Sequence, residues 1–229
     1  MMEGLGSRVL ETEEYFLEKL GNYDRLRETV HVGIPDNQGP FNLAAEIIGR
    51  AIFLELYDHP DLLHELLTLL TETYVEFTSF HKGIVGEEMD RNYYFQYILR
   101  GGVRIAEDHA LGISPHMYEE FCQPYNIRAF QPFEGGTMLV CGEASHILGI
   151  VLETPGVRGV IYWSSNIDDL SDVYEEAAQR KIAVMWYGDV PEESLEEVST
   201  GVIVKRQVKS LQEAEEIQRK FRRNYQSSF

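Results

Sequence analysis

Short apolar runs rich in β-forming residues alternate with helical stretches along most of this chain, and this alternation constrains the fold more than any other feature. Each run carries apolar residues on both sides, as expected for parallel strands covered on both faces. The pattern therefore predicts an α/β fold in which crossover helices join parallel strands. Six strands are expected: Thr29–Ile34, Val103–Ala106, Thr137–Cys141, Val157–Trp163, Ile182–Tyr187 and Gly201–Val204.

Helix boundaries have their own sequence signals. Pro60 fits the first turn of a long helix with a leucine-rich stripe on one face. Ser114-Pro115 predicts a second helix start, because a capping serine is followed by proline at the first helical position. Ser210 with Glu213 forms a capping-box pattern that opens the last helix. We expect a helical lead-in over residues 1–28 and a single domain whose partial barrel covers residues 29–229.

Composition limits the partners of this chain. Its 229 residues contain 20 Lys and Arg against 38 Asp and Glu, which gives a net charge of −18. This charge repels nucleic-acid phosphates and anionic lipids, so neither a nucleic acid nor a membrane is expected as a partner. Two cysteines are too few for a disulfide scaffold, and no signal-like apolar run begins the sequence. A cytoplasmic location is therefore expected.

Chemically varied side chains follow the expected strands. Glu107, Asp108 and His109 follow the second strand. Cys141 ends the third strand, and Glu143 follows it. In an α/β barrel, residues just past the carboxyl ends of the strands face the active site. These side chains are therefore candidates for a ligand site. The residues that end or follow the remaining strands are Trp163, Asn166, Tyr187 and Lys205.

Several segments resemble the uroporphyrinogen decarboxylase superfamily, which includes the heme-pathway decarboxylase and the cobamide-dependent methyltransferases. The resemblance runs from about Gly39 to the end of the chain. It implies a TIM-type (β/α)8 barrel with a ligand at its carboxyl-terminal mouth. The segments are GPFNLAAEIIG at Gly39–Gly49, LYDHPDLLHELL at Leu56–Leu67, RIAEDHALGISPHMYEEFCQPY at Arg104–Tyr125, MLVCGEASHIL at Met138–Leu148 and TPGVRGV at Thr154–Val160.

The resemblance also implies that the barrel is incomplete. The superfamily's first barrel strands precede the matching region, so about six strands are expected where a closed barrel needs eight, with the first two missing. A partial barrel has two open edges, which are liabilities for a soluble protein. We expect these edges to be covered by a helix near Leu10–Leu20, by a second copy, or by a complementary chain.

The zinc motif of the methyltransferases is degenerate in this sequence. The resemblance implies a His-x-Cys ligand pair at a central strand end and a second cysteine near the carboxyl terminus. Here the strand reads Leu139-Val140-Cys141, and Gly201–Gln207 contains no cysteine. Leucine cannot ligate a metal, and Cys141 is the only family ligand that remains. No zinc site is therefore expected.

Three residues are the catalytic candidates: Asp108, Glu107 and Cys141. Adjacent side chains in an extended chain point to opposite faces, and comparison with the family's Asp-Asp pair favours Asp108 as the pocket residue. The carboxylate of Asp108 either holds substrate or binds a metal with His109 or Glu143. Cys141 is either a reactive thiol or a small buried apolar residue. The ligand-binding candidates are Asn42, Glu46, which replaces the decarboxylase tyrosine, His109, Glu143, Trp163, Asn166, Tyr187 and Lys205.

The resemblance leaves three functions open. The leading expectation is a corrinoid methyltransferase-like protein that binds a small molecule or cobamide, with a corrinoid protein as a further partner. The second is uroporphyrinogen decarboxylase itself, which uses no cofactor. The third is a non-catalytic binding subunit, or one half of a split enzyme. Fold likeness alone does not choose between these functions.

Overall fold

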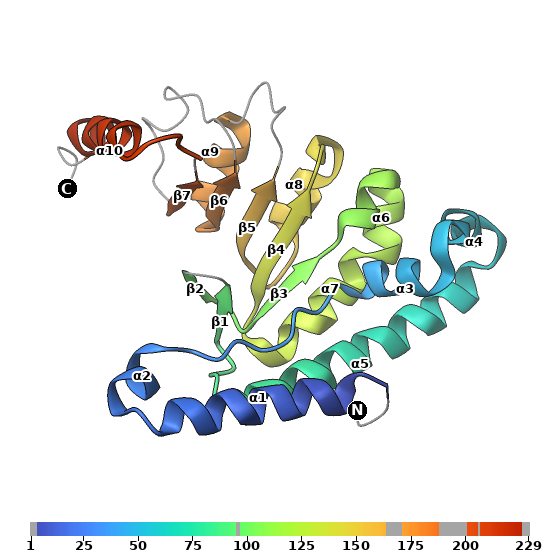
Figure 1. The fold of residues 1–229 in the computed structure, drawn as a ribbon. Helices are drawn as coiled ribbons and strands as arrows, with labels where there is room; N and C mark the ends of the chain where they lie inside the picture. Colours follow the sequence, from blue (N-terminus) through green and yellow to red (C-terminus); the bar gives the residue numbers. More distant parts are fainter. Residues whose placement is uncertain (1–3, 95–96, 164–170, 188–200, 206, 226–229) are drawn as a thin grey trace.

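The structure is a computed structural model that describes residues 4–94, 97–163, 171–187, 201–205 and 207–225, apart from the side chains of residues 171, 172, 187 and 220–225 (Figure 1). Five parallel strands form one sheet, and their order in the sheet follows their order in the chain. They are β3 (Val103–Ala106), β4 (Gly136–Cys141), β5 (Val157–Trp163), β6 (Ala183–Tyr187) and β7 (Val202–Lys205). The α/β prediction and five of the six expected strands are therefore confirmed. The sheet is compatible with part of a TIM-type barrel.

Helices precede the sheet and connect its strands. The predicted cap at Ser114 is confirmed, because its Oγ accepts a hydrogen bond from the backbone N–H of Met117 at 3.3 Å. The predicted start of the last helix is also confirmed, since Ser210 Oγ accepts from the N–H of Glu213 at 3.2 Å. The α-helices are α1 (Gly6–Gly21), α2 (Asp24–Thr29), α3 (Pro40–Ile48), α4 (Ile52–Asp58), α5 (Pro60–Val85), α6 (Pro115–Phe121), α7 (Gln123–Phe130), α8 (Ser145–Glu153), α9 (Ser171–Arg180) and α10 (Leu211–Tyr225). Short 3-10 helices are η1 (Gly49–Ala51), η2 (Asp108–Gly112) and η3 (Gln131–Phe133).

The expected strand at Thr29–Ile34 is wrong. Thr29 ends α2, and residues 30–39 form irregular chain. The reason lies at the outer edge of β3, where two outward-pointing backbone carbonyls already accept hydrogen bonds from other parts of the chain. The hydroxyl of Tyr74 on α5 donates to Arg104 O at 2.9 Å, and the N–H of Gly39 donates to Ala106 O at 2.9 Å. A strand placed here would have to displace both donors.

An antiparallel hairpin was not expected from the sequence. It consists of β1 (Arg91–Tyr94) and β2 (Tyr97–Arg100). Three of its side chains, Tyr94, Tyr97 and Leu99, pack on the face of the sheet that the interior of a barrel would use. The hairpin therefore covers part of this face within the chain itself.

Alternation along the strands gives the parallel sheet two different faces. The helix face packs on the helices and belongs to the main core, and α8 and α9 contact β5 and β6 respectively. The inner face lies under the hairpin and holds a smaller buried cluster. Buried side chains of the helix face are Val103, Ile105, Met138, Val140, Val160, Tyr162, Val184 and Trp186. Those of the inner face are Ala106, Leu139, Ile161 and Met185.

The N-terminal helix does not pack on a sheet edge. It lies along α5 (Figure 1), and the two helices are joined by a buried hydrogen bond of 2.7 Å between Glu13 Oε2 and His81 Nδ1. Tyr74 of α5 and Gly39 supply the hydrogen-bond donors at the edge of β3 instead. Among the described residues, no helix is long and apolar enough to cross a membrane.

Candidate functional site

Four of the predicted site residues come together at the carboxyl ends of β3 and β4. Asn42, on the first turn of α3, accepts a hydrogen bond through Oδ1 from the backbone N–H of His109 at 2.9 Å. Asp108 accepts through Oδ1 from the backbone N–H of Cys141 at 3.0 Å. These bonds tie α3, η2 and the end of β4 into one network. The sheet order brings β3 and β4 together, so their polar ends share one edge of the sheet.

Glu107 has a different role from its neighbour Asp108. It is 1 % exposed, and its Oε2 and Oε1 accept from the backbone N–H groups of Asn42 at 3.0 Å and Phe41 at 3.3 Å. The carboxyl group therefore closes the amino terminus of α3, where unpaired N–H groups and the helix dipole favour an acceptor. Burial raises the pKa of Glu107 to about 8, although the two N–H bonds act in the opposite direction. Glu107 was expected to be catalytic, and its geometry is that of a buried helix cap.

A glycine makes this cap sterically feasible. A Cβ placed on Gly39 would lie 2.5 Å from Glu107 Oε1 and 2.7 Å from Ile105 Cγ2. The close approach of the carboxyl group to the helix start therefore requires glycine at this position. Gly39 belongs to the quoted GPFNLAAEIIG segment, but its steric role follows only from the position of Glu107.

Cys141 is partly buried beside Asp108. Burial, together with the charge and hydrogen bond of Asp108, raises the pKa of the Cys141 thiol to about 11, although Arg104 acts in the opposite direction. The thiol is the predominant form at neutral pH, and the thiol is a much weaker nucleophile than the thiolate. This geometry favours a contact or positioning role for Cys141 over direct nucleophilic attack.

Arg104 is a site residue that the sequence analysis missed. Its guanidinium is largely buried, and burial lowers its pKa, whereas the nearby Cys141 and Asp108 act in the opposite direction. A single cation within the apolar run Val103–Ala106 was the available sequence signal. A buried cation in a strand usually needs a specific partner.

The side chains at the methyltransferase zinc position do not fit a zinc ion. Leu139 is buried in the apolar inner-face cluster, and burial and Asp108 keep the Cys141 thiol protonated. Zinc binds thiolate, imidazole or carboxylate groups in a closed arrangement. In the described part of the chain, no group of three or more His, Cys, Asp or Glu side chains is arranged to hold a metal ion.

The other predicted ligand-binding residues lie at separate places. Glu46 is exposed on α3. Glu143 precedes α8, and its Oε1 accepts from the N–H of Ser145 at 3.1 Å. This interaction with Ser145 lowers the pKa of Glu143. Lys205 is exposed at the end of β7.

The last three candidates lie at the ends of β5 and β6 or just beyond them. Trp163 ends β5 with its side chain 53 % exposed and pairs in register with Cys141 on β4. Tyr187 ends β6, but its side chain is not among those described. Asn166 lies outside the described residues. Trp163 therefore joins the edge that carries Asp108 and Cys141.

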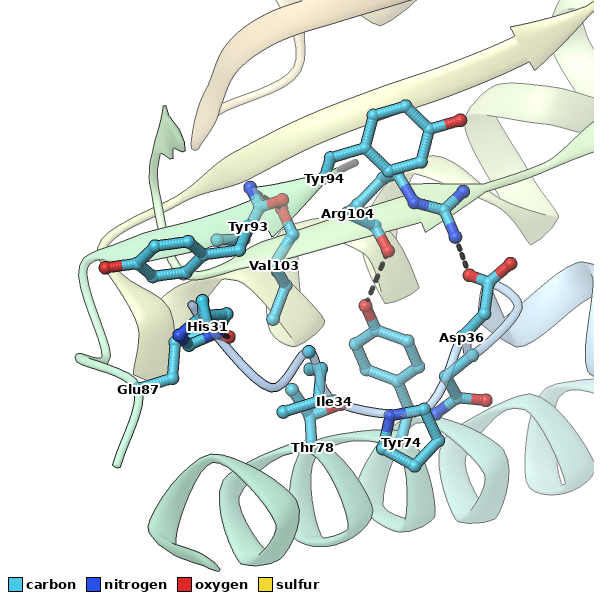
Figure 2. A pocket seen from close by; sticks show the side chains of 15 residues that line it. His31, Ile34, Asp36, Tyr74, Thr78, Glu87, Tyr93, Tyr94, Val103 and Arg104 are labelled. Atoms are coloured by element: carbon cyan, nitrogen blue, oxygen red, sulfur yellow. Dashed lines mark hydrogen bonds and ion pairs between the residues drawn. The ribbon is translucent and has the colours of Figure 1, made fainter. Parts of the chain in front are cut away.

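A cavity of about 370 Å³ lies at the outer edge of β3, away from the predicted mouth (Figure 2). Its walls come from α5, the hairpin, β3 and the irregular segment 31–37. Sequence analysis gave no sign of it, because residues distant in the chain form it together. Its polar lining includes His31, Asp36, Tyr74, Glu87, Tyr93 and Arg104.

Comparison with known proteins does not assign this chain to a family. No protein-family model matches it, and no curated protein and no solved structure matches it. A functional proposal for the chain therefore rests on its own residues and geometry, together with the sequence resemblance.

Proposed function

We propose that this chain is a small-molecule-binding protein of the uroporphyrinogen decarboxylase superfamily, related to its cobamide-dependent methyltransferases. Its ligand would bind at the carboxyl ends of β3, β4 and β5. The proposal rests on the resemblance of the quoted segments and on one structural observation. Three adjacent strands present an acid, a thiol and an indole side by side, at Asp108, Cys141 and Trp163.

The three groups suit a flat polar ligand. The exposed indole of Trp163 offers a surface on which a conjugated ring can stack. Asp108 offers a carboxylate that is held in place by the Cys141 N–H. The imidazole of His109 is positioned by Asn42, whose Oδ1 lies 3.2 Å from His109 Nδ1. A corrin ring carries peripheral amides that such polar groups can bind.

The proposal is tested by isothermal titration calorimetry with hydroxocobalamin. We expect Asp108→Asn and Trp163→Ala each to weaken binding by about tenfold, which corresponds to about 1.4 kcal/mol. Asp58→Asn is the matched control, because Asp58 is an exposed acid at the end of α4, remote in the chain from these strand ends. Its affinity for hydroxocobalamin should equal that of the wild type.

The same titration with uroporphyrin III separates the two enzyme branches. Binding of uroporphyrin alone, with the same sensitivity to Asp108→Asn, would replace the methyltransferase assignment by the decarboxylase one. Absence of binding to both ligands would overturn the proposal. Methylcobalamin mixed with a small thiol then distinguishes an enzyme from a binding subunit, because methyl transfer changes the corrinoid absorbance.

A further inference from the structure

We propose that the cavity at the outer edge of β3 binds a small aromatic or similarly flat molecule through a single carboxylate, and that Arg104 recognises this carboxylate in competition with Asp36. The cavity uses neither Asp108 nor Cys141 as lining residues. Arg104 lies near both places, but the ligand proposed for the cavity would contact neither Asp108 nor Cys141.

The size and walls of the cavity suit a small molecule. Its volume of about 370 Å³ falls within the range of ordinary ligand pockets, at the lower end. Val103 and Ile34 contribute apolar walls, and the rings of Tyr93 and Tyr94 contribute flat ones. Most of the other lining residues are polar, so the apolar and aromatic walls lie beside several hydrogen-bonding groups.

Arg104 is the cation that selects the ligand class. Its side chain is only 10 % exposed, and its guanidinium lies 4.9 Å from the centroid of the Tyr94 ring. A guanidinium in such a setting needs an opposite charge to offset its lost hydration. Its planar fork matches a carboxylate and can hold it through two parallel hydrogen bonds.

The present partner of Arg104 is poorly suited to hold it permanently. Asp36 pairs with the guanidinium, yet the Asp36 side chain is 69 % exposed and lies on the irregular segment 31–37. Figure 2 shows the two side chains facing each other at one end of the cavity. A solvated carboxylate can swing into water at low cost. An incoming carboxylate could then take its place on Arg104.

The opposite end of the cavity excludes a second anion. His31 stacks on Tyr93, with ring centroids 3.6 Å apart and planes 16° from parallel. His31 Nε2 lies 3.0 Å from Glu87 Oε2, and Glu87 also accepts from the fully buried Lys82. The buried acid Glu87 disfavours a negative group here, whereas the stacked rings favour a flat apolar one. The geometry therefore places one carboxylate at the Arg104 end and the body of the ligand beside the stacked pair of His31 and Tyr93.

The test compares benzoate with benzamide, which has nearly the same shape but no charge. We expect wild-type protein to bind benzoate at least about tenfold more tightly than benzamide in calorimetric or NMR titrations, because charge-assisted hydrogen bonds are the stronger ones. Asp36→Asn removes the competing carboxylate and should tighten benzoate binding about three- to tenfold. Arg104→Met should abolish the preference for benzoate over benzamide.

Asp36→Asn decides the question, because the Asp36 side chain is 69 % exposed, whereas Arg104→Met also removes a largely buried side chain. Asp58→Asn serves as the control for an acid removed elsewhere and should leave the benzoate affinity unchanged. Equal binding of benzoate and benzamide, or benzoate binding that is unchanged or weaker in Asp36→Asn, would overturn the proposal. Hydroxocobalamin binding should be the same in Asp36→Asn and wild type, which separates this test from that of the strand-end site.

Discussion

The helix face and the inner face belong to the same five strands, yet their buried groups have different uses. On the helix face even an acid is structural, because Glu107 is buried there as the cap of α3. On the inner face the hairpin covers a small apolar cluster, and Arg104 and Cys141 lie partly buried at its margins. The difference indicates that packing against the helices makes even a buried acid structural, whereas the inner face keeps polar side chains partly accessible at its margins.

The strongest test of this contrast removes one methionine from each face. Met138 on the helix face is 0 % exposed, and Met185 on the inner face is 3 % exposed. We expect Met138→Ala to lower the free energy of unfolding by about 4–5 kcal/mol and Met185→Ala by about 2 kcal/mol, because the helix face is surrounded by the larger core. Urea denaturation measures both variants. Equal losses would show that the two faces contribute alike.

The second test follows the pH dependence that Glu107 brings to the helix face. Its pKa is about 8 in the folded protein against an ordinary value of 4.5, so the folded state holds the proton more tightly. The resulting stabilisation is complete below about pH 4.5 and is lost as the pH rises towards about 8. We expect Glu107 to account for a fall on the order of 2–4 kcal/mol in the free energy of unfolding between about pH 5 and 8.

Glu107→Gln should remove this part of the pH slope, as measured by urea denaturation across the same pH range. The slope is the relevant quantity, because glutamine also loses one of the two acceptors for the α3 N–H groups. Glu46→Gln is the control on the same helix, since Glu46 is exposed, and its slope should match the wild type. An unchanged slope in Glu107→Gln would show that Glu107 is ionised in the folded protein at neutral pH.

The smallest expected change in stability concerns Gly39, whose lack of a Cβ leaves space for the Glu107 carboxyl group at the start of α3. Gly39→Ala should lower the free energy of unfolding by about 1–3 kcal/mol, because its Cβ would overlap Glu107 and Ile105. Gly149→Ala is the matched control in α8, where a Cβ would meet nothing within 4 Å. That change should instead stabilise the protein by about 0.5–1 kcal/mol, because alanine is the better helix former. Thermal and urea unfolding measure both, and a neutral Gly39→Ala would contradict the close packing of the cap.

The sequence predicted the elements whose signals are local. Strands β3 to β7 were recognisable because each is a short apolar run with polar residues beyond its end. The error at Thr29–Ile34 arose because β-propensity does not reveal whether a free sheet edge exists, and Tyr74 and Gly39 already occupy that of β3. The hairpin was missed because its sequence, RNYYFQYILR, lacks an Asn-Gly or Asp-Gly turn.

The meeting of Asp108 and Cys141 was predictable from the sequence, but the contacts around them were not. The sheet order dictates that Asp108 and Cys141 lie at one edge, and strand ends can be read from sequence. The different hydrogen-bond partners of Glu107 and Asp108 depend on where α3 begins in space, which no spacing reveals. The pairing of Arg104 with Asp36 likewise joins segments far apart in the chain, so the cavity could be found only in the structure.

The agreement between strand order and chain order has a consequence for biosynthesis. Each new strand pairs with the edge strand that precedes it in the chain. No strand has to insert between two strands that are already paired. A nascent chain can therefore lengthen its sheet in the order in which the ribosome delivers it, beginning at β3, whose outer edge is bonded to Tyr74 of α5 and to Gly39. Loss of β7 by early termination would leave a narrower sheet ending at β6, with no gap in its middle.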